Sequence, residues 1–109
     1  MPINVPNELR GLVTTEHQEA YMAWVEPAAA LSDLLKSGKV WGRKATPICQ
    51  AYDNACHEFA KFLIGEPKPV ANWLMDLAYV NAMMNGIGKG KRSLSNRTRK
   101  HYKRLSRLK

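Results

Sequence analysis

The residues with the clearest chemical potential lie at the C-terminal end of the chain, where basic side chains are crowded and acidic ones are absent. The segment from Lys89 to Lys109 holds ten basic residues and no Asp or Glu, which gives it a net charge of +10. A lysine or arginine held near a nucleic-acid phosphate releases condensed counterions, and this release drives association without base recognition. We therefore predict that the segment binds nucleic-acid phosphates. The predicted contacts are Lys89, Lys91, Arg92, Arg97, Arg99, Lys100, Lys103, Arg104 and Arg107.

Two rings within this basic segment, His101 and Tyr102, offer surfaces on which bases could stack. Arginine-rich segments that fold on binding are a common mode of RNA recognition. RNA is accordingly favoured slightly over DNA, and Tyr102 joins the predicted nucleic-acid-binding residues. If about half of the ten charges engage phosphates, log affinity should fall with log salt at a slope of roughly −3 to −5.

A second, smaller basic cluster runs from Lys36 to Lys44 and has Trp41 among its cations. An exposed tryptophan beside cations can stack on a base or anchor a protein interface. Trp41 can equally pack back on the body of the protein, and the sequence leaves both interpretations open. We add Trp41, Arg43 and Lys44 to the candidate nucleic-acid-binding residues.

Three other roles stay open for the C-terminal segment: binding an acidic protein, binding an anionic membrane, or serving as a solvated extension without a specific ligand. A membrane is the least favoured of the named ligands, because the apolar stripe of the segment contains no Trp or Phe anchor. We therefore expect no membrane partner.

The glycine-rich stretch from Gly86 to Ser93 invites comparison with a nucleotide-binding loop. That motif needs a glycine five positions before its Gly-Lys pair and a Ser or Thr directly after the lysine. Around Gly90 and Lys91 those two positions hold Asn85 and Arg92. The comparison therefore fails.

The residue types that serve catalysis or metal binding occur without the spacing that either needs. Cys56 and His57 are neighbours in a predicted helix and point about 100° apart, which disfavours both a zinc site and a Cys–His nucleophile. The acids are scattered, and although Asp53 and Asp76 could be paired in the fold, no dyad of defined separation is evident. We expect a protein that is not an enzyme and that has no cofactor and no metal.

The apolar periodicity that must position these residues is helical throughout. A first helix is predicted to start near Thr15, with Thr15 as its cap and Gln18 at the reciprocal capping-box position, and to end at Gly38. Pro27 either breaks it near Glu26 or leaves it kinked.

Two more helices are predicted in the body. One begins at Thr46-Pro47 and closes at Gly65, and the other follows the stiff linker Glu66–Pro69 and closes at Gly86. Trp24 and Trp73 are assigned to the core. Cys49 and Cys56 lie seven residues apart in one helix, so they cannot pair with each other, and both are interpreted as small buried residues.

The resulting fold class is all-α, a small bundle of three to four helices with a basic C-terminal arm. We divide the chain into an extended leader (residues 1–13), a helical body (14–86) and a glycine-hinged basic arm (87–109). Residues 1–88 contain seven basic and nine acidic residues, a net charge of −2, so the whole positive excess lies in the arm.

One weak apolar stripe gives the arm a helical pattern, formed by Leu94, Thr98, Tyr102, Leu105 and Leu108. Ser93 is a candidate cap. Ten uncompensated charges repel one another, so the arm is expected to be flexible, and to become helical only when a polyanion screens it.

These inferences favour a non-enzymatic accessory protein whose arm contacts RNA or DNA while its body docks on a larger assembly or self-associates. The alternative is a small regulator or inhibitor whose helical body binds a protein partner, with the arm steering the encounter electrostatically. The N-terminus carries no secretory pattern. We expect a soluble intracellular protein, cytoplasmic or virion-associated.

Overall fold

The fold was analysed in a computed structural model that describes residues 5–38, 43, 45–87 and 94–108. These residues form a short 3-10 helix, η1 (Asn7–Leu9), and four α-helices: α1 (Thr15–Ser37), α2 (Ala45–Ile64), α3 (Lys68–Met84) and α4 (Leu94–Arg107). No strand occurs among them. The predicted all-α class is confirmed. None of the described helices is both long and apolar enough to cross a membrane.

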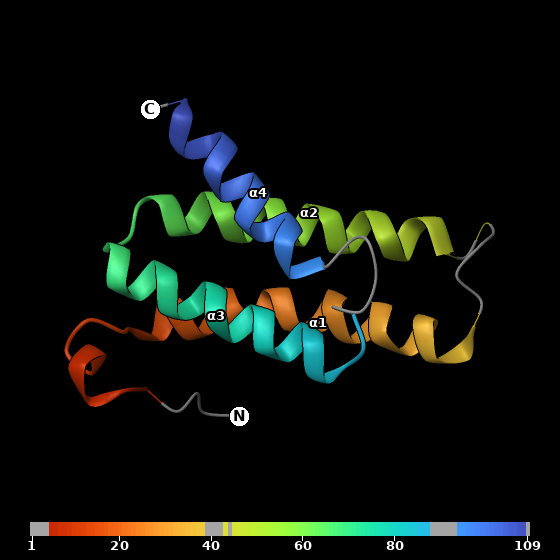
Figure 1. Cartoon of the computed structure of the whole chain (residues 1–109), viewed down its shortest axis with the longest axis horizontal. Helices are drawn as coiled ribbons and strands as arrows, with labels where there is room; N and C mark the ends of the chain where they lie inside the picture. Colours follow the sequence, from red (N-terminus) through yellow and green to blue (C-terminus); the bar gives the residue numbers. More distant parts are fainter. Residues whose placement is uncertain (1–4, 39–42, 44, 88–93, 109) are drawn as a thin grey trace.

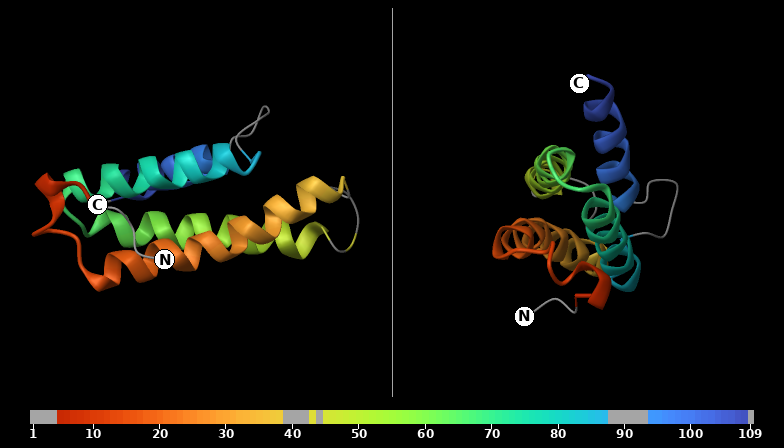
Figure 2. Two further views of the ribbon diagram at one scale, coloured as in Figure 1. Left: turned by 90° about the horizontal axis from the view of Figure 1, so that it is seen from below. Right: turned by 90° about the vertical axis from the view of Figure 1, so that its left-hand side faces the viewer.

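Helices α1, α2 and α3 lie lengthwise beside one another, and α4 crosses obliquely over α2 and α3 (Figure 1). The end-on view in Figure 2 shows α4 on the side of the molecule away from α1. The described residues of the basic arm therefore form a fourth helix, which packs on the body.

Helix α1 begins at Thr15, as predicted, but its cap lies one residue earlier than predicted. Thr14, not Thr15, is the cap, and its hydroxyl accepts a hydrogen bond from the backbone N–H of His17 at 3.4 Å. His17, not Gln18, completes the capping box, because its Nδ1 accepts the backbone N–H of Thr14 at 2.8 Å. A histidine ring does here what a Glu or Gln side chain usually does. The buried His17 also places its Nε2 3.2 Å from Glu66 Oε2, which ties the start of α1 to the α2–α3 connection.

Pro27 does not end α1, which continues through it to Ser37. Of the two predicted outcomes, continuation is the one observed. The helix then ends at Gly38, whose φ of 74° is the left-handed conformation that the sequence predicted for this position.

The second helix begins and ends close to the predicted positions, and the third ends close to its predicted position but begins at Lys68, inside the predicted linker Glu66–Pro69. Proline in the first turn of α3 costs little, because the first N–H groups of a helix have no intrahelical partner. At the other end, Gly86 has φ 79°, its N–H bonds to Met83 O at 3.1 Å, and the N–H of Ile87 bonds to Ala82 O at 2.8 Å. This is a Schellman motif, and it returns the buried Ile87 to the core.

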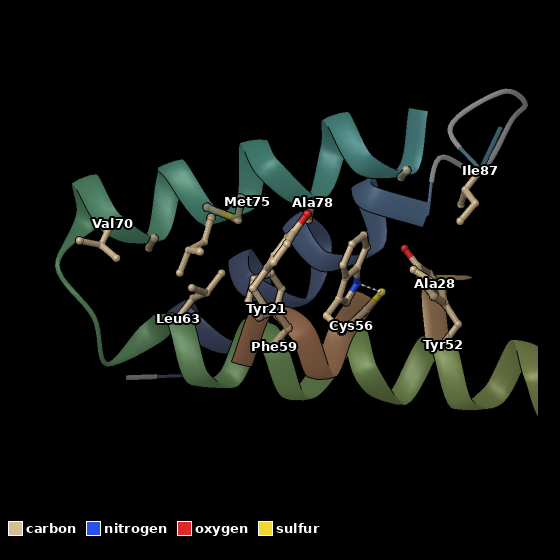
Figure 3. Packing of buried hydrophobic residues seen from close by; sticks show 14 of the residues in the cluster. Tyr21, Ala28, Tyr52, Cys56, Phe59, Leu63, Val70, Met75, Ala78 and Ile87 are labelled. Atoms are coloured by element: carbon tan, nitrogen blue, oxygen red, sulfur yellow. Dashed lines mark hydrogen bonds between the residues drawn. The ribbon is translucent and has the colours of Figure 1, made fainter. Parts of the chain in front are cut away.

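The core is built around Trp24, which is 1% exposed. Its ring lies 5.9 to 6.2 Å from those of Tyr21, Tyr52 and Phe59, and its indole N–H donates to Cys56 Sγ at 3.4 Å. Figure 3 shows α2 and α3 side chains pointing toward one another beside this cluster. Trp24 is in the core as predicted.

Two other residues are less buried than predicted. Trp73 is half-buried and packs against the core from outside, and Cys49 is half-buried rather than buried. Part of the predicted extended leader is helical, because residues 7–9 form the 3-10 helix η1. Leu9 of this helix is buried in the core.

Candidate nucleic-acid interface

Helix α4 presents one face to the body and the opposite face to solvent. On the docked face Thr98 is 1% exposed, and Tyr102 and Leu105 are half-buried. These residues belong to the predicted apolar stripe, whereas Leu108 at its end is 79% exposed. The stripe is thus used to seat α4 on α2 and α3.

The α2 flank of α4 is held by a carboxylate. Asp53 Oδ1 lies 3.1 Å from Arg97 Nη1 and 3.5 Å from His101 Nε2. The His101 ring also meets the ring of His57 edge to face, with centroids 5.2 Å apart. Residues 53 and 57 on α2, and 97 and 101 on α4, are each four apart, so each pair occupies one helix face.

The α3 flank is held in the same way. Arg99 Nη2 donates to Asp76 Oδ1 at 2.6 Å, and the guanidinium lies over the Tyr79 ring, 5.6 Å from its centroid. Two of the charges that were predicted to be uncompensated are therefore paired with acids of the body. The repulsion that favoured a frayed arm is correspondingly reduced.

The solvent-facing side of α4 carries the cations that remain, which we call the outward face. Lys100, Lys103, Arg104 and Arg107 are all exposed. Their spacing of three, one and three residues confines them to an arc of about 100° and a length of about 10 Å. Within the described part of the chain none of the four forms an ion pair with a carboxylate. Arg104 Nη2 instead lies 3.3 Å from His101 Nδ1.

Three of these cations, Lys103, Arg104 and Arg107, lie in the C-terminal half of α4. Positive charge near a helix C-terminus is stabilised by the helix dipole. The outward face therefore strengthens the helix that presents it.

The remaining predicted residues are not brought to this face. Arg97 and Arg99 lie on its two flanks in ion pairs, and Tyr102 turns to the body. Arg43 is exposed just before α2, and the start of α2 and the C-terminal end of α4 lie at opposite ends of the molecule (Figure 1). Five predicted residues fall outside the described part of the chain: Lys89, Lys91, Arg92, Trp41 and Lys44.

Beneath α4 lies a buried group of polar atoms rather than a reactive site. Burial raises the pKa of the Cys56 thiol, and the neighbouring Thr98 and Tyr52 hydroxyls and the Trp24 indole lower it only in part. Burial likewise raises the pKa of Tyr52. A thiol with a raised pKa is a poor nucleophile. Across the described residues, no three His, Cys, Asp or Glu side chains are arranged to hold a metal ion.

No protein-family model, curated protein or solved structure matches this chain.

Sequence reasoning missed the part that Asp53 and Asp76 play in seating the arm. They do not pair with each other, and each meets an arginine of α4. The available signal was the opposite sign of the two parts of the chain, −2 for residues 1–88 and +10 for residues 89–109. Opposite charge on tethered segments favours their contact as well as contact with a separate polyanion.

Proposed function

We propose that this chain is a non-enzymatic nucleic-acid-binding accessory protein whose outward face contacts phosphates while its helical body docks on a larger assembly. The observation that carries the proposal is the alignment of Lys100, Lys103, Arg104 and Arg107 on one exposed face of a seated helix. An intracellular setting, cytoplasmic or within a virion, suits this role.

The expected salt dependence follows from the number of these cations. Each cation that neutralises a phosphate contributes about 0.7 to 0.9 to the slope of log affinity against log salt. Four contacts therefore give a slope of roughly −3 to −4. Cations of residues 89–93 and Lys109 would steepen it if they also reach phosphates.

The test is an anisotropy titration at several salt concentrations with the full chain and two charge-matched variants. The outward-face variant replaces four arm cations with glutamine: Lys100, Lys103, Arg104 and Arg107. The control variant replaces four exposed cations elsewhere: Arg10, Lys36, Lys61 and Lys68. Both lower the net charge from +8 to +4. Glutamine has nearly the helix propensity of lysine and arginine, so α4 should persist, which circular dichroism checks.

We expect the outward-face variant to lose most affinity and to flatten the slope by about 3, while the control keeps a slope close to that of the parent. Equal losses in the two variants would mean that net charge alone is responsible, and the proposed interface would be wrong.

The alternative, a regulator that binds a protein partner through its body, is favoured by a different surface. Exposed apolar side chains gather near the end of α3, where Val80 is 51%, Met83 46% and Met84 81% exposed. An open pocket of about 310 Å3 lies beside them, lined by Leu35, Lys36 and residues 83–86. Such a patch is typical of protein contacts.

This alternative predicts that replacing Met83 and Met84 by serine abolishes association with a protein partner or with a second copy, measured by sedimentation. It also predicts that the intact chain has no measurable affinity for nucleic acid.

A further inference from the structure

Resting on the proposed function, we infer that the outward face binds double-stranded nucleic acid, DNA or RNA, through its phosphate backbone in preference to single strands. The preference for duplexes depends on where the two rings of the arm, His101 and Tyr102, lie.

Single strands are bound largely by stacking their bases on aromatic side chains. His101 and Tyr102 are the only aromatic residues between residues 89 and 109. The His101 side chain is 15% exposed and lies against the His57 ring, and its Nε2 is 3.5 Å from Asp53 Oδ1. Tyr102 is half-buried against the core. A nucleic acid that meets the outward face therefore finds cations and no ring.

The ion pairs on the two flanks hold the helix that carries the cations against the body. Arg97 with Asp53 on one side, and Arg99 with Asp76 on the other, fasten α4 to α2 and α3. A duplex presents its phosphates at fixed positions and carries one charge per about 1.7 Å of axis. A single strand loses conformational freedom when its phosphates are aligned along the helix. A duplex, whose phosphates are already ordered, therefore binds this packed helix at a lower entropic cost than a single strand does.

The shape of the molecule leaves room for a duplex. Figures 1 and 2 show the C-terminal end of α4 projecting beyond α2, where no other described helix flanks it. A broad, rigid surface such as a duplex backbone can approach this end of the helix without meeting the body.

Four labelled probes test the inference with the full chain: duplexes of DNA and of RNA of about 20 base pairs, roughly two turns, and a single strand of each. With four contacts, the slopes expected are about −3.6 for a duplex and about −2.8 for a single strand. If the affinities converge near 1 M salt, each duplex binds about sixfold tighter than its strand at 0.1 M. The ratio of the two duplex affinities measures the preference of the chain between DNA and RNA.

A second measurement uses Tyr102→Leu, which keeps an apolar side chain on the docked face, with circular dichroism to verify that α4 is retained. Affinity for the single-strand probes, as for the duplexes, should change by less than about twofold, whereas a base stacked on Tyr102 would be worth at least about fivefold. His101→Gln provides the same readout if Tyr102→Leu loses the helix.

The outcomes separate the two proposals. Single strands binding as tightly as duplexes, or loss of affinity in a Tyr102→Leu variant that retains α4, would overturn the duplex preference and leave the proposed function standing. Absence of binding to all four probes would overturn both.

Discussion

The two ion pairs that flank α4 should contribute unequally to stability, and the shorter one should contribute less. Arg99 and Asp76 approach to 2.6 Å, but their side chains are 44% and 69% exposed. Arg97 and Asp53 lie 3.1 Å apart with side chains 30% and 43% exposed. The distances differ by a factor of about 1.2, whereas the effective dielectric constant differs by up to about fourfold between bulk water and a site near the protein surface. Solvent screening therefore decides the order.

The expected magnitudes follow from measured surface pairs, which contribute about 0.2 to 1 kcal/mol. We place the coupling energy of Asp53 with Arg97 near the upper end, about 1 kcal/mol, because the pair is less exposed and His101 adds a second contact to the same oxygen. The coupling of Asp76 with Arg99 should be about 0.3 kcal/mol. A loss of 1 kcal/mol corresponds to a melting temperature lower by about 4 °C.

Urea unfolding in two double-mutant cycles measures both values. One cycle uses Asp53→Asn with Arg97→Gln, and the other uses Asp76→Asn with Arg99→Gln. Each cycle subtracts the separate effects of its two substitutions and leaves the pairwise energy. Raising the salt concentration should weaken the Asp76 pair more, because exposed charges are screened more strongly. Coupling energies that are equal, or larger for Asp76, would refute the screening argument.

Three further outcomes are expected. Asp53→Asn with Asp76→Asn releases two arginines and should steepen the salt slope of duplex binding by up to about 1.8 in the anisotropy assay. The charge-matched control removes two exposed acids of α1, Glu19 and Glu26. A thiol reagent should modify Cys49 in the native chain well before Cys56, which is buried and has a raised pKa. The reaction should therefore have a fast and a slow phase, and Cys56→Ala should abolish the slow one. Because the pKa of Cys56 is raised in the folded chain, its thiol ionises more readily in the unfolded chain. The free energy of unfolding should therefore fall above about pH 9, by up to about 1.4 kcal/mol per pH unit from this residue. Urea titrations at several pH values should show a smaller pH dependence for Cys56→Ala.

The helices of the body could be predicted because local signals coincide with them. Gly38 follows α1 and Gly86 follows α3, and both have the positive φ for which glycine is favoured, as expected for residues that close a helix. Pro69 lies in the first turn of α3, where proline is tolerated. The cap was assigned to Thr15 instead of Thr14 because either of two adjacent threonines can cap a helix. Thr14 is the cap in the structure because His17 completes its capping box, and histidine is outside the usual Glu or Gln pattern.

The seating of α4 could not be predicted from periodicity alone. A stripe of Thr98, Tyr102 and Leu105 is weak, and local pattern does not say what covers it. The deciding interactions join residues 44 and 23 positions apart, Arg97 with Asp53 and Arg99 with Asp76. The separation of negative and positive charge along the chain indicated that the arm binds anions. It did not show whether these anions are carboxylates of the body or phosphates of a ligand.

The seated helix changes how the function of the arm can be tested. Removing everything after Gly88 would delete the cations and would also uncover the part of α2 that Thr98 covers, where Tyr52 and Cys56 are now fully buried. Exposing buried apolar and polar groups destabilises a fold, so lost nucleic-acid binding in such a truncation would have two causes. Substitutions on the outward face remove charge from side chains that already lie in solvent. They separate the phosphate contacts of α4 from its contribution to the core, because the docked face and its ion pairs stay intact.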